Sequence, residues 1–263
     1  MKLAHWIVVL LVSLVACTED PAYSVVNEDD PTVETPEDTE TPDSPASKDP
    51  LAGMKLMQYS RGVVEKMIAQ IKSGDEKLGG MALMSLPSHP GHFKDHPELM
   101  DELVVPALIE ATKPGGKPVF RGVAVGKLAQ MAGASKKVMP ALLTALDDDE
   151  LRQHLCHGVG KINADVTPIV EKLASLLSRG SDRARREAAV GLGSCGSASK
   201  SAIPALIKAL GDDNRTVRRD VAHALGRIGP DARPAIDALR AAAKDKWGPA
   251  RFAAESAIKK IGG

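Results

Sequence analysis

The sequence predicts an all-α protein, an α-solenoid of about six helical hairpins. The main observation is a period of 33 residues, which places Arg152, Arg185, Arg218 and Arg251 at the same point of four successive copies. A fixed period of about 20–50 residues is typical of proteins in which one supersecondary unit stacks on copies of itself. A second observation is that no copy alternates apolar and polar residues with period two, so strands are not expected.

Each copy is predicted to contain two helices, A and B. In the best copy, apolar residues in 202–210 recur at i, i+3, i+4 and i+7, as on one face of a helix. The turn 211–214 supplies N-capping residues for helix B, which continues the same spacing through Val217, Val221, Leu225 and Ile228. Prolines near the start of each A helix support this register: Pro106, Pro140, Pro168, Pro204 and Pro234.

Two more copies extend the repeats toward the N-terminus. Arg121 and Leu128 mark a fifth copy, slightly less than one period before Arg152. A degenerate sixth copy is predicted between Arg61 and Leu86 from two apolar stripes, namely Val64, Met67, Ile68 and Ile71, then Leu78, Met81, Ala82 and Met84. The repeat domain is therefore predicted to span residues 53–263, with an insertion at 87–98.

Residues 217–229 have the pattern V-R-x-x-x-A-x-A-L-G-x-I-G after an acidic turn. This pattern resembles the short HEAT-like repeats first described in phycobilisome lyases and known in many bacterial proteins. The resemblance covers roughly residues 53–263. It implies a solenoid whose B helices line a concave face and whose repeated arginine helps to hold neighbouring units together, but it implies no single chemistry.

The repeated arginines are predicted to be structural residues between repeats: Arg121, Arg152, Arg185, Arg218 and Arg251. Those in the last repeats begin helix B soon after acidic turn residues such as Asp147, Asp182 and Asp213. Charge-assisted hydrogen bonds between units are therefore within reach. We interpret these arginines as part of the repeated interface rather than as a clamp for a substrate.

Residues 1–16 are predicted to be a lipoprotein signal peptide. A short basic start precedes an apolar segment too short to span a membrane. The segment ends in Leu14-Val15-Ala16-Cys17, which resembles a bacterial lipobox and implies lipid attachment at Cys17; the alternative is an ordinary signal peptide followed by a chance cysteine. Thr18 stands where an aspartate would retain an enteric lipoprotein in the inner membrane, so the resemblance favours the outer membrane within the cell envelope.

Residues 17–52 are predicted to be a disordered acidic tether. The stretch 18–50 contains eleven acidic residues, one lysine and six prolines, with almost no large apolar residue after Val33. Such a composition buries too little apolar surface to offset the loss of chain entropy on folding. The tether would hold the repeat domain away from the membrane.

The formal net charge of zero conceals a strongly basic C-terminal part. Residues 18–50 carry a net charge of −10, and residues 151–263 carry +9. The outward positions of successive B helices are expected to form a cationic strip on the concave face, made of Gln153, His157, Lys161, Arg186, Arg219, His223, Arg227 and Lys260. Such a strip would attract an anionic partner. An acidic protein segment, an anionic envelope polymer and the chain's own tether all fit, and ordinary solvated side chains are the alternative.

Nucleic acid is disfavoured as a partner. The chain carries a predicted export signal, and only 3% of its residues are aromatic. Stacking platforms for single strands are therefore almost absent.

Several apparent catalytic motifs lack the structural context that their chemistry needs. Residues 191–196 match G-x-G-x-x-G, but they are predicted to end a helix rather than to link a strand to a helix. Residues 122–127 are one residue short of a phosphate loop and lie inside a predicted helix. Cys156 and Cys195 are expected to be small core residues too far apart to form a disulfide.

The insertion 87–98 contains the only candidate metal ligands that stand close together in sequence, namely His89, His92 and His96 beside Asp95. Imidazole and carboxylate are suitable ligands for zinc, copper or nickel. Prolines 87, 90 and 97 argue against a helix here. A solvent-exposed polar loop is the favoured interpretation, and the metal site is a weak candidate.

These observations predict a lipid-anchored scaffold that presents a basic concave surface to a protein or other anionic partner in the cell envelope. No enzymatic activity and no cofactor are expected. The alternative is a metal-dependent enzyme built on the histidine insertion, or a lyase-like activity implied by the resemblance. Export disfavours the lyase, because bilin lyases act on cytoplasmic proteins.

Overall fold

The computed structural model describes residues 59–262. The predicted signal peptide, Cys17 and the acidic tether lie outside these residues. Within the described part the chain is helical, with one isolated bridge between Pro114 and Gly116 and no strand. The predicted all-α class is therefore confirmed. No helix in this part is long and apolar enough to cross a membrane.

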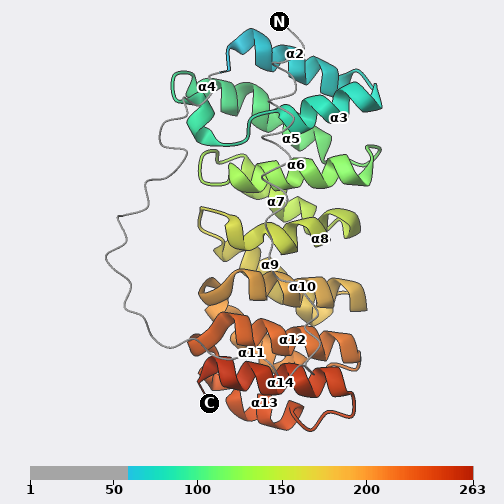
Figure 1. The fold of residues 1–263 in the computed structure, drawn as a ribbon, viewed down its shortest axis with the longest axis vertical. Coiled ribbons are helices and arrows are strands. Elements are labelled where there is room, and N and C mark those ends of the chain that lie inside the picture. Colours follow the sequence, from blue (N-terminus) through green and yellow to red (C-terminus); the bar gives the residue numbers. More distant parts are fainter. Residues whose placement is uncertain (1–58, 263) are drawn as a thin grey trace, which may run out of the picture. The chain divides into compact units, whose positions relative to one another are not determined.

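The described residues form six helical hairpins stacked in chain order (Figure 1). The A helices are α2 (Arg61–Lys72), α5 (Val105–Ala111), α7 (Val138–Ala145), α9 (Thr167–Arg179), α11 (Ile203–Ala209) and α13 (Ile236–Ala242). The B helices are α3 (Glu76–Ser85), α6 (Pro118–Gln130), α8 (Asp149–Gly158), α10 (Asp182–Ser194), α12 (Arg215–Ile228) and α14 (Gly248–Ile261). Each B helix packs against the next one, so the B helices form one layer, which we call the B-helix face.

The sequence of each hairpin explains where its helices begin. The side chain of Asn214 accepts hydrogen bonds from the backbone N–H groups of Thr216 and Val217, which caps α12. Pro204 lies in the first turn of α11, where its missing N–H costs no intrahelical hydrogen bond. Short 3-10 helices lead into the last two A helices, Gly196–Ala202 before α11 and Gly229–Ala235 before α13.

The apolar stripes of the repeats form one continuous core. In α12 the predicted residues are all buried, with Val217, Val221 and Leu225 at 0% exposure. They belong to the same cluster as buried residues of α2 and α14, so the core runs through every repeat. Because each unit buries its apolar stripe against its neighbours, the units depend on one another for stability.

Glycines at equivalent positions of successive repeats set the distance between the B helices. A Cβ atom on Gly193 would lie 2.9 Å from the Cα of Ala224 in α12, and one on Gly226 would lie 3.0 Å from the Cα of Ala257 in α14. Gly160 is equivalent, since its Cβ would lie 2.2 Å from the carbonyl oxygen of Ser194. The absent side chains therefore permit close contact between helix backbones.

The last repeat carries polar residues where a following repeat would pack. Glu255 and Lys259 of α14 are exposed, and they occupy the positions held by Ala222 and Gly226 one repeat earlier. A long charged side chain at the glycine position prevents the close approach of another B helix. The C-terminal hairpin therefore has the polar outer face of a capping repeat.

The first hairpin differs from its predicted pattern. Val64 and Ile68 are buried as expected, but Leu78, Met81 and Met84 are 49%, 43% and 58% exposed. The prediction of a buried stripe through these three residues was wrong. The reason is that α3 turns its two glycines inward, with Gly79 against the backbone of α2 and Gly80 against Phe120 of α6, so the larger side chains point away.

The insertion is more helical than predicted. It contains a 3-10 helix, Pro90–Phe93, and a short α4, Pro97–Leu99, which continues through a π-helix, Met100–Val104, into α5. Pro90 and Pro97 are the first residues of their helices, a position where proline favours a helix rather than breaking it. Phe93 and Leu99 are 2% and 1% exposed and hold the segment against the core.

We expect Gly193→Ala and Gly126→Ala to have opposite effects on stability. Alanine at residue 193 must push α10 away from α12, which costs about 1–3 kcal/mol. Gly126 lies inside α6 with no atom within 4 Å of a Cβ, so alanine there gains about 0.5–1 kcal/mol of helix propensity. Urea unfolding followed by circular dichroism measures both, and equal stabilisation by the two substitutions would contradict the close-contact interpretation.

Candidate binding surface

The repeated arginines connect the A–B turns of successive repeats. The Arg185 guanidinium donates to both carboxylate oxygens of Asp212 at 2.7 and 2.9 Å and to the carbonyl of Gly180 in its own turn at 3.0 Å. Arg218 makes the same pair one repeat later, with Asp245 at 2.6 and 3.1 Å. Bidentate pairing of this kind is both strong and geometrically specific. Each pair therefore joins one turn to the next.

Three of the five arginines vary this arrangement. Arg121 is 5% exposed and pairs with Asp148 and Glu150 of the next turn. For Arg152, the position in the next turn that Asp212 holds for Arg185 is occupied by Arg179. Arg152 therefore bonds instead to Asp149 at 2.7 Å and to Glu187 at 3.4 Å. Arg251 lies in the last repeat, where its only hydrogen bonds among the described residues go to the carbonyls of Asp245 and Lys246.

The acids that accept from the repeated arginines across repeats differ from those that the sequence pointed to, although Asp147 and Asp182 do accept from Lys172 and Asn214 of the next repeat. Sequence reasoning named Asp147, Asp182 and Asp213, which precede each arginine in its own turn. In the structure the partners of these arginines across repeats include Asp212 and Asp245, which lie in the turn after their arginines.

The hydrogen bond from Arg218 lowers the pKa of Asp245, and this effect outweighs burial, which would raise that pKa. Because a lowered carboxyl pKa stabilises the fold above the unfolded-state pKa, this contribution is lost as the pH falls through the folded pKa.

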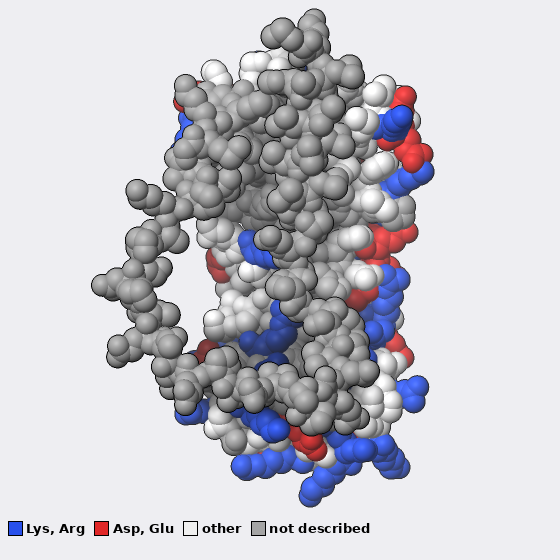
Figure 2. All heavy atoms as spheres, in the orientation of Figure 1, with Lys and Arg blue, Asp and Glu red and all other residues white. Residues whose placement is uncertain are grey.

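The residues predicted to form a cationic strip lie on α8, α10, α12 and α14 or, for Lys161, in the 3-10 helix Val159–Lys161 that follows α8. Lys161, Arg227 and Lys260 occupy one position in different repeats, and all three are exposed without a carboxylate partner in the described residues. The Cδ atoms of Arg227 and Lys260 lie near Gly193 and Gly226 of the preceding helices, so both side chains cross the neighbouring helix in the same way. Figure 2 shows lysine and arginine gathered in the lower half of the view, where α10, α12 and α14 lie.

Two other residues of the predicted strip share a buried acid. Arg186 of α10 donates to Asp220 at 3.2 Å, and Arg219 donates to the other oxygen of the same carboxylate at 2.7 Å. Asp220 is 7% exposed. The two guanidinium groups are therefore held in place by one carboxylate and carry one net positive charge together with it.

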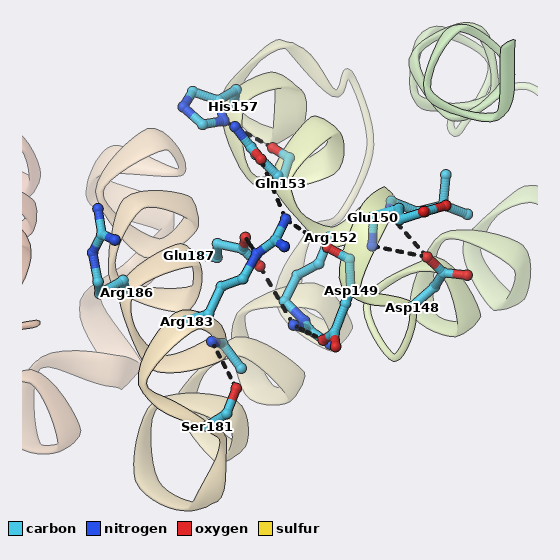
Figure 3. Close-up of polar contacts among 12 residues, drawn as sticks. Asp148, Asp149, Glu150, Arg152, Gln153, His157, Ser181, Arg183, Arg186 and Glu187 are labelled. Carbon is cyan, nitrogen blue, oxygen red and sulfur yellow. Dashed lines mark hydrogen bonds and ion pairs between the residues drawn. The ribbon is translucent and has the colours of Figure 1, made fainter. Parts of the chain in front are cut away.

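Sequence reasoning missed Asp220 and Glu187, which holds the equivalent position one repeat earlier. Glu187 accepts from Arg183 at 2.7 Å and from Arg152 at 3.4 Å (Figure 3). An acid at one position of two consecutive repeats is a signal in the sequence that could have identified both. They attach arginines of one B helix to the next.

The first members of the strip are held by local hydrogen bonds. Arg183 extends from α10 toward α8 and donates to Gln153 at 3.4 Å and to the carbonyl of Asp149 at 3.1 Å (Figure 3). The His157 ring bonds through Nδ1 to the carbonyl of Gln153 at 2.8 Å.

His223 lies within the positive field of the strip. The pKa of His223 is lowered by partial burial and by the neighbouring cations Arg219 and Lys260, while Asp220 acts in the opposite direction. The cations of two consecutive B helices therefore act on one imidazole, which places them around a common point of the surface.

The α12–α14 end of the strip includes two aromatic residues that sequence reasoning also missed. The guanidinium carbons of Arg215 and Arg219 lie 5.1 and 5.8 Å from the ring centroid of Trp247, within the range of cation–π contacts. Phe252 of α14 is 69% exposed, and it occupies the position that Arg219 holds one repeat earlier. Trp247 and Phe252 each occur in one repeat only, so neither gives a repeated pattern in the sequence.

The structure brings two of the three histidines of the insertion close together, with the ring centroids of His89 and His92 6.0 Å apart, while His96 pairs elsewhere. His89 accepts through Nδ1 from the backbone N–H of Gly91, and His96 bonds to Glu98 at 3.2 Å. The His92 ring packs against Tyr59 with centroids 5.8 Å apart. Within residues 59–262 no three histidine, cysteine or acidic side chains are arranged to hold a metal ion.

The two described cysteines have the surroundings of core residues. Both are free thiols, and burial raises the pKa of Cys156 to about 12 and that of Cys195 to about 11. A thiol with so high a pKa is a poor nucleophile near neutral pH.

Lys127 is a buried amine of α6. Burial lowers its pKa to about 8, and its Nζ donates to the carbonyl of Leu86 at 2.6 Å.

With this geometry described, the chain can be compared with known proteins. Residues 170–259 match the HEAT repeats family. This segment runs from α9 into α14 and so contains most of the cationic end of the strip. No curated protein matches the sequence.

Solved structures of engineered repeat proteins are similar to most of the chain. A designed armadillo repeat protein in complex with the peptide (KR)4 is 16% identical over 75% of this chain and 99% of that one, with a TM-score of 0.46. An engineered protein is 20% identical over 76% and 98%, with a TM-score of 0.47. A computationally designed armadillo repeat protein for modular peptide recognition is 18% identical over 75% and 99%, with a TM-score of 0.44.

We expect Arg218→Met to destabilise the protein more than Arg251→Met. The first substitution leaves Asp245 without its bidentate partner and removes a charge-assisted connection between turns, which costs about 1.5–3 kcal/mol. The second removes only hydrogen bonds to backbone carbonyls at the end of the stack. Thermal and urea unfolding of both variants test this, and a loss at residue 251 as large as that at residue 218 would show that contacts between repeats are not what the arginine contributes.

Proposed function

We propose that this protein is an interaction scaffold that binds an acidic segment of a partner protein on its B-helix face. The observation that carries the proposal is the adjacent pair Arg227 and Lys260, with Lys161 two repeats before Arg227 and Ser194 between them; the three cations are exposed and lack carboxylate partners in the described residues. A row of like charges along stacked helices concentrates anionic ligands and orients them. Stacked repeats commonly use such extended surfaces for binding.

The lowered pKa of His223 supports the same proposal. Burial is the main cause of this lowered pKa, and repulsion by Arg219 and Lys260, which lie on neighbouring helices, lowers it further while Asp220 acts in the opposite direction. A carboxylate bound at this point would relieve that repulsion. The α12–α14 end of the strip is therefore the preferred contact for the acidic segment.

The proposed scaffold is not an enzyme. Burial disfavours ionisation of the described cysteines, and within residues 59–262 the insertion histidines form no group of three that could hold a metal ion. A metal-dependent or lyase-like activity therefore has no assembled group of residues to support it in residues 59–262. We propose no cofactor.

We expect the double substitution Arg227→Glu/Lys260→Glu to weaken binding of a fluorescent oligoglutamate peptide about tenfold at low salt, because both positions repel the ligand after the change. The double substitution Lys66→Glu/Lys208→Glu reverses the same charge on exposed positions of α2 and α11 and is the matched control. Fluorescence anisotropy measures both. Equal weakening by the two variants would mean that net charge alone attracts the peptide.

Arg186 and Arg219 are less suitable for charge reversal. A glutamate at either position would face Asp220, so it would reduce stability as well as binding. Arg227 and Lys260 avoid this problem, since they bond to no described acid.

We further propose that the chain is a lipoprotein of the cell envelope, anchored through Cys17, with the outer membrane favoured. The support is the lipobox-like sequence Leu14-Val15-Ala16-Cys17. The acidic stretch that follows it would then separate the scaffold from the membrane surface.

We expect Cys17→Ser to abolish incorporation of labelled fatty acid in a bacterial host and to release the protein from membranes. The reason is that the thiol is the proposed site of lipid attachment. Cys195→Ala keeps Cys17 and should retain the label. Undiminished labelling of the Cys17→Ser variant would show that the protein is not lipidated at this residue.

A further inference from the structure

The strip has a composition that changes along the stack, and this restricts what can bind there. Arg186, Arg219 and Phe252 occupy the same position in three consecutive B helices, each one repeat period after the last. Two cations are thus followed by an aromatic side chain. Trp247 and Arg215 lie next to Arg219, so the aromatic end also includes a second cation. We call Arg215, Arg219 and Trp247, together with the exposed Phe252 five residues after Trp247, the Trp247 subsite.

The two arginines are already oriented for carboxylates. Arg186 uses only its Nε on Asp220, and Arg219 uses its Nε and Nη2. Their side chains are still 43% and 33% exposed, and the described residues make no other hydrogen bond to them. The remaining N–H groups can bind a ligand without the entropy cost of ordering a free arginine side chain.

The usual spacing of packed helices is close to the side-chain repeat of one backbone conformation of a peptide. Packed helix axes lie about 8–10 Å apart. Polyproline II helices repeat every three residues with a rise of about 3.1 Å per residue, so equivalent side chains recur about every 9.3 Å. A peptide in this conformation, lying along the stack, would present every third side chain to successive B helices.

Phe252 supplies the specificity that charge alone cannot. It lies near the start of α14, and the half-buried Trp247 directly precedes that helix. An exposed phenylalanine favours an apolar or aromatic ligand side chain over water. Phe252 holds the position in α14 that Arg186 and Arg219 hold in the two preceding B helices. A ligand that satisfies all three positions therefore has acid, acid and aromatic side chains at intervals of three residues.

We propose that the B-helix face binds an extended peptide with acidic residues at two positions three apart and an aromatic residue three positions beyond them, the aromatic side chain entering the Trp247 subsite. Either chain direction of the peptide satisfies the spacing. This inference rests on the proposed function, since it specifies the partner of the same surface. A polyanion without an aromatic group is therefore not expected to bind as tightly as such a peptide.

The test compares peptides binding to the full chain. The matched peptide contains Glu-Pro-Ala-Glu-Pro-Ala-Phe, and a second contains the reverse order. One control replaces the phenylalanine by alanine, and another has the same composition with the two glutamates adjacent. We expect the better of the two orders to bind about tenfold more tightly than the alanine control, because burial of one aromatic side chain contributes that much. It should also bind more tightly than the control with adjacent glutamates, which cannot place its two carboxylates on Arg186 and Arg219 at the same time.

Protein variants locate the effect. Phe252→Ala should remove the advantage of the aromatic peptide over its alanine control while leaving binding of the control unchanged. Val119→Ala removes an equally exposed apolar side chain, 68% exposed on α6, and should retain the full advantage. In a Trp6→Phe background Trp247 is the single tryptophan of the chain, so its fluorescence should change on addition of the aromatic peptide.

The possible failures separate this inference from the proposed function. If the matched peptides and both controls bind equally, or polyphosphate of equal charge binds as tightly, the aromatic subsite is wrong while a charge-based scaffold stands. If Arg227→Glu/Lys260→Glu leaves binding of every acidic peptide unchanged, the proposed function itself is wrong.

Discussion

Close contact between the backbones of successive B helices is the constraint on which the rest of the structure depends. Gly193 and Gly226 leave no room for a side chain against Ala224 and Ala257, so α10, α12 and α14 stand at a nearly constant separation. That separation brings Arg185 and Arg218 within bonding distance of acids in the next turn. It also lets Arg227 and Lys260 extend across the neighbouring helix. The same packing therefore produces both the interface between repeats and the outer surface.

The arginines of the repeat have two kinds of environment, and the difference explains their roles. Those at the start of each B helix are mostly buried and bond to carbonyls and carboxylates of adjacent turns. Those one residue later, Arg186 and Arg219, lie at the surface and share Asp220. Neighbours in sequence thus point in different directions because successive residues of a helix are separated by about 100°. Apart from the exposed Arg251 of the last repeat, the second kind is the more accessible to a partner.

Charge on this surface is shaped by its acids as much as by its bases. Asp220 neutralises part of the strip but holds Arg186 and Arg219 in fixed positions, and a fixed cation binds a carboxylate at lower entropic cost than a free one. The uncompensated cations Lys161, Arg227 and Lys260 then supply the long-range field. Recognition on such a surface combines attraction over distance with contacts at defined intervals.

The repeat period by itself determined the helical hairpins, their order, the buried stripe of α12 and the recurrence of cations on the B helices, because these follow from local spacing along one chain. Only the tertiary structure decided which acid each arginine meets, since Asp212 and Asp245 are distant in sequence from Arg185 and Arg218 and are brought close by stacking. It also decided that Leu78, Met81 and Met84 face outward, because the first unit has glycines on its inner side. Contacts between repeats depend on the distance and rotation between units, and a repeat read along the sequence specifies neither.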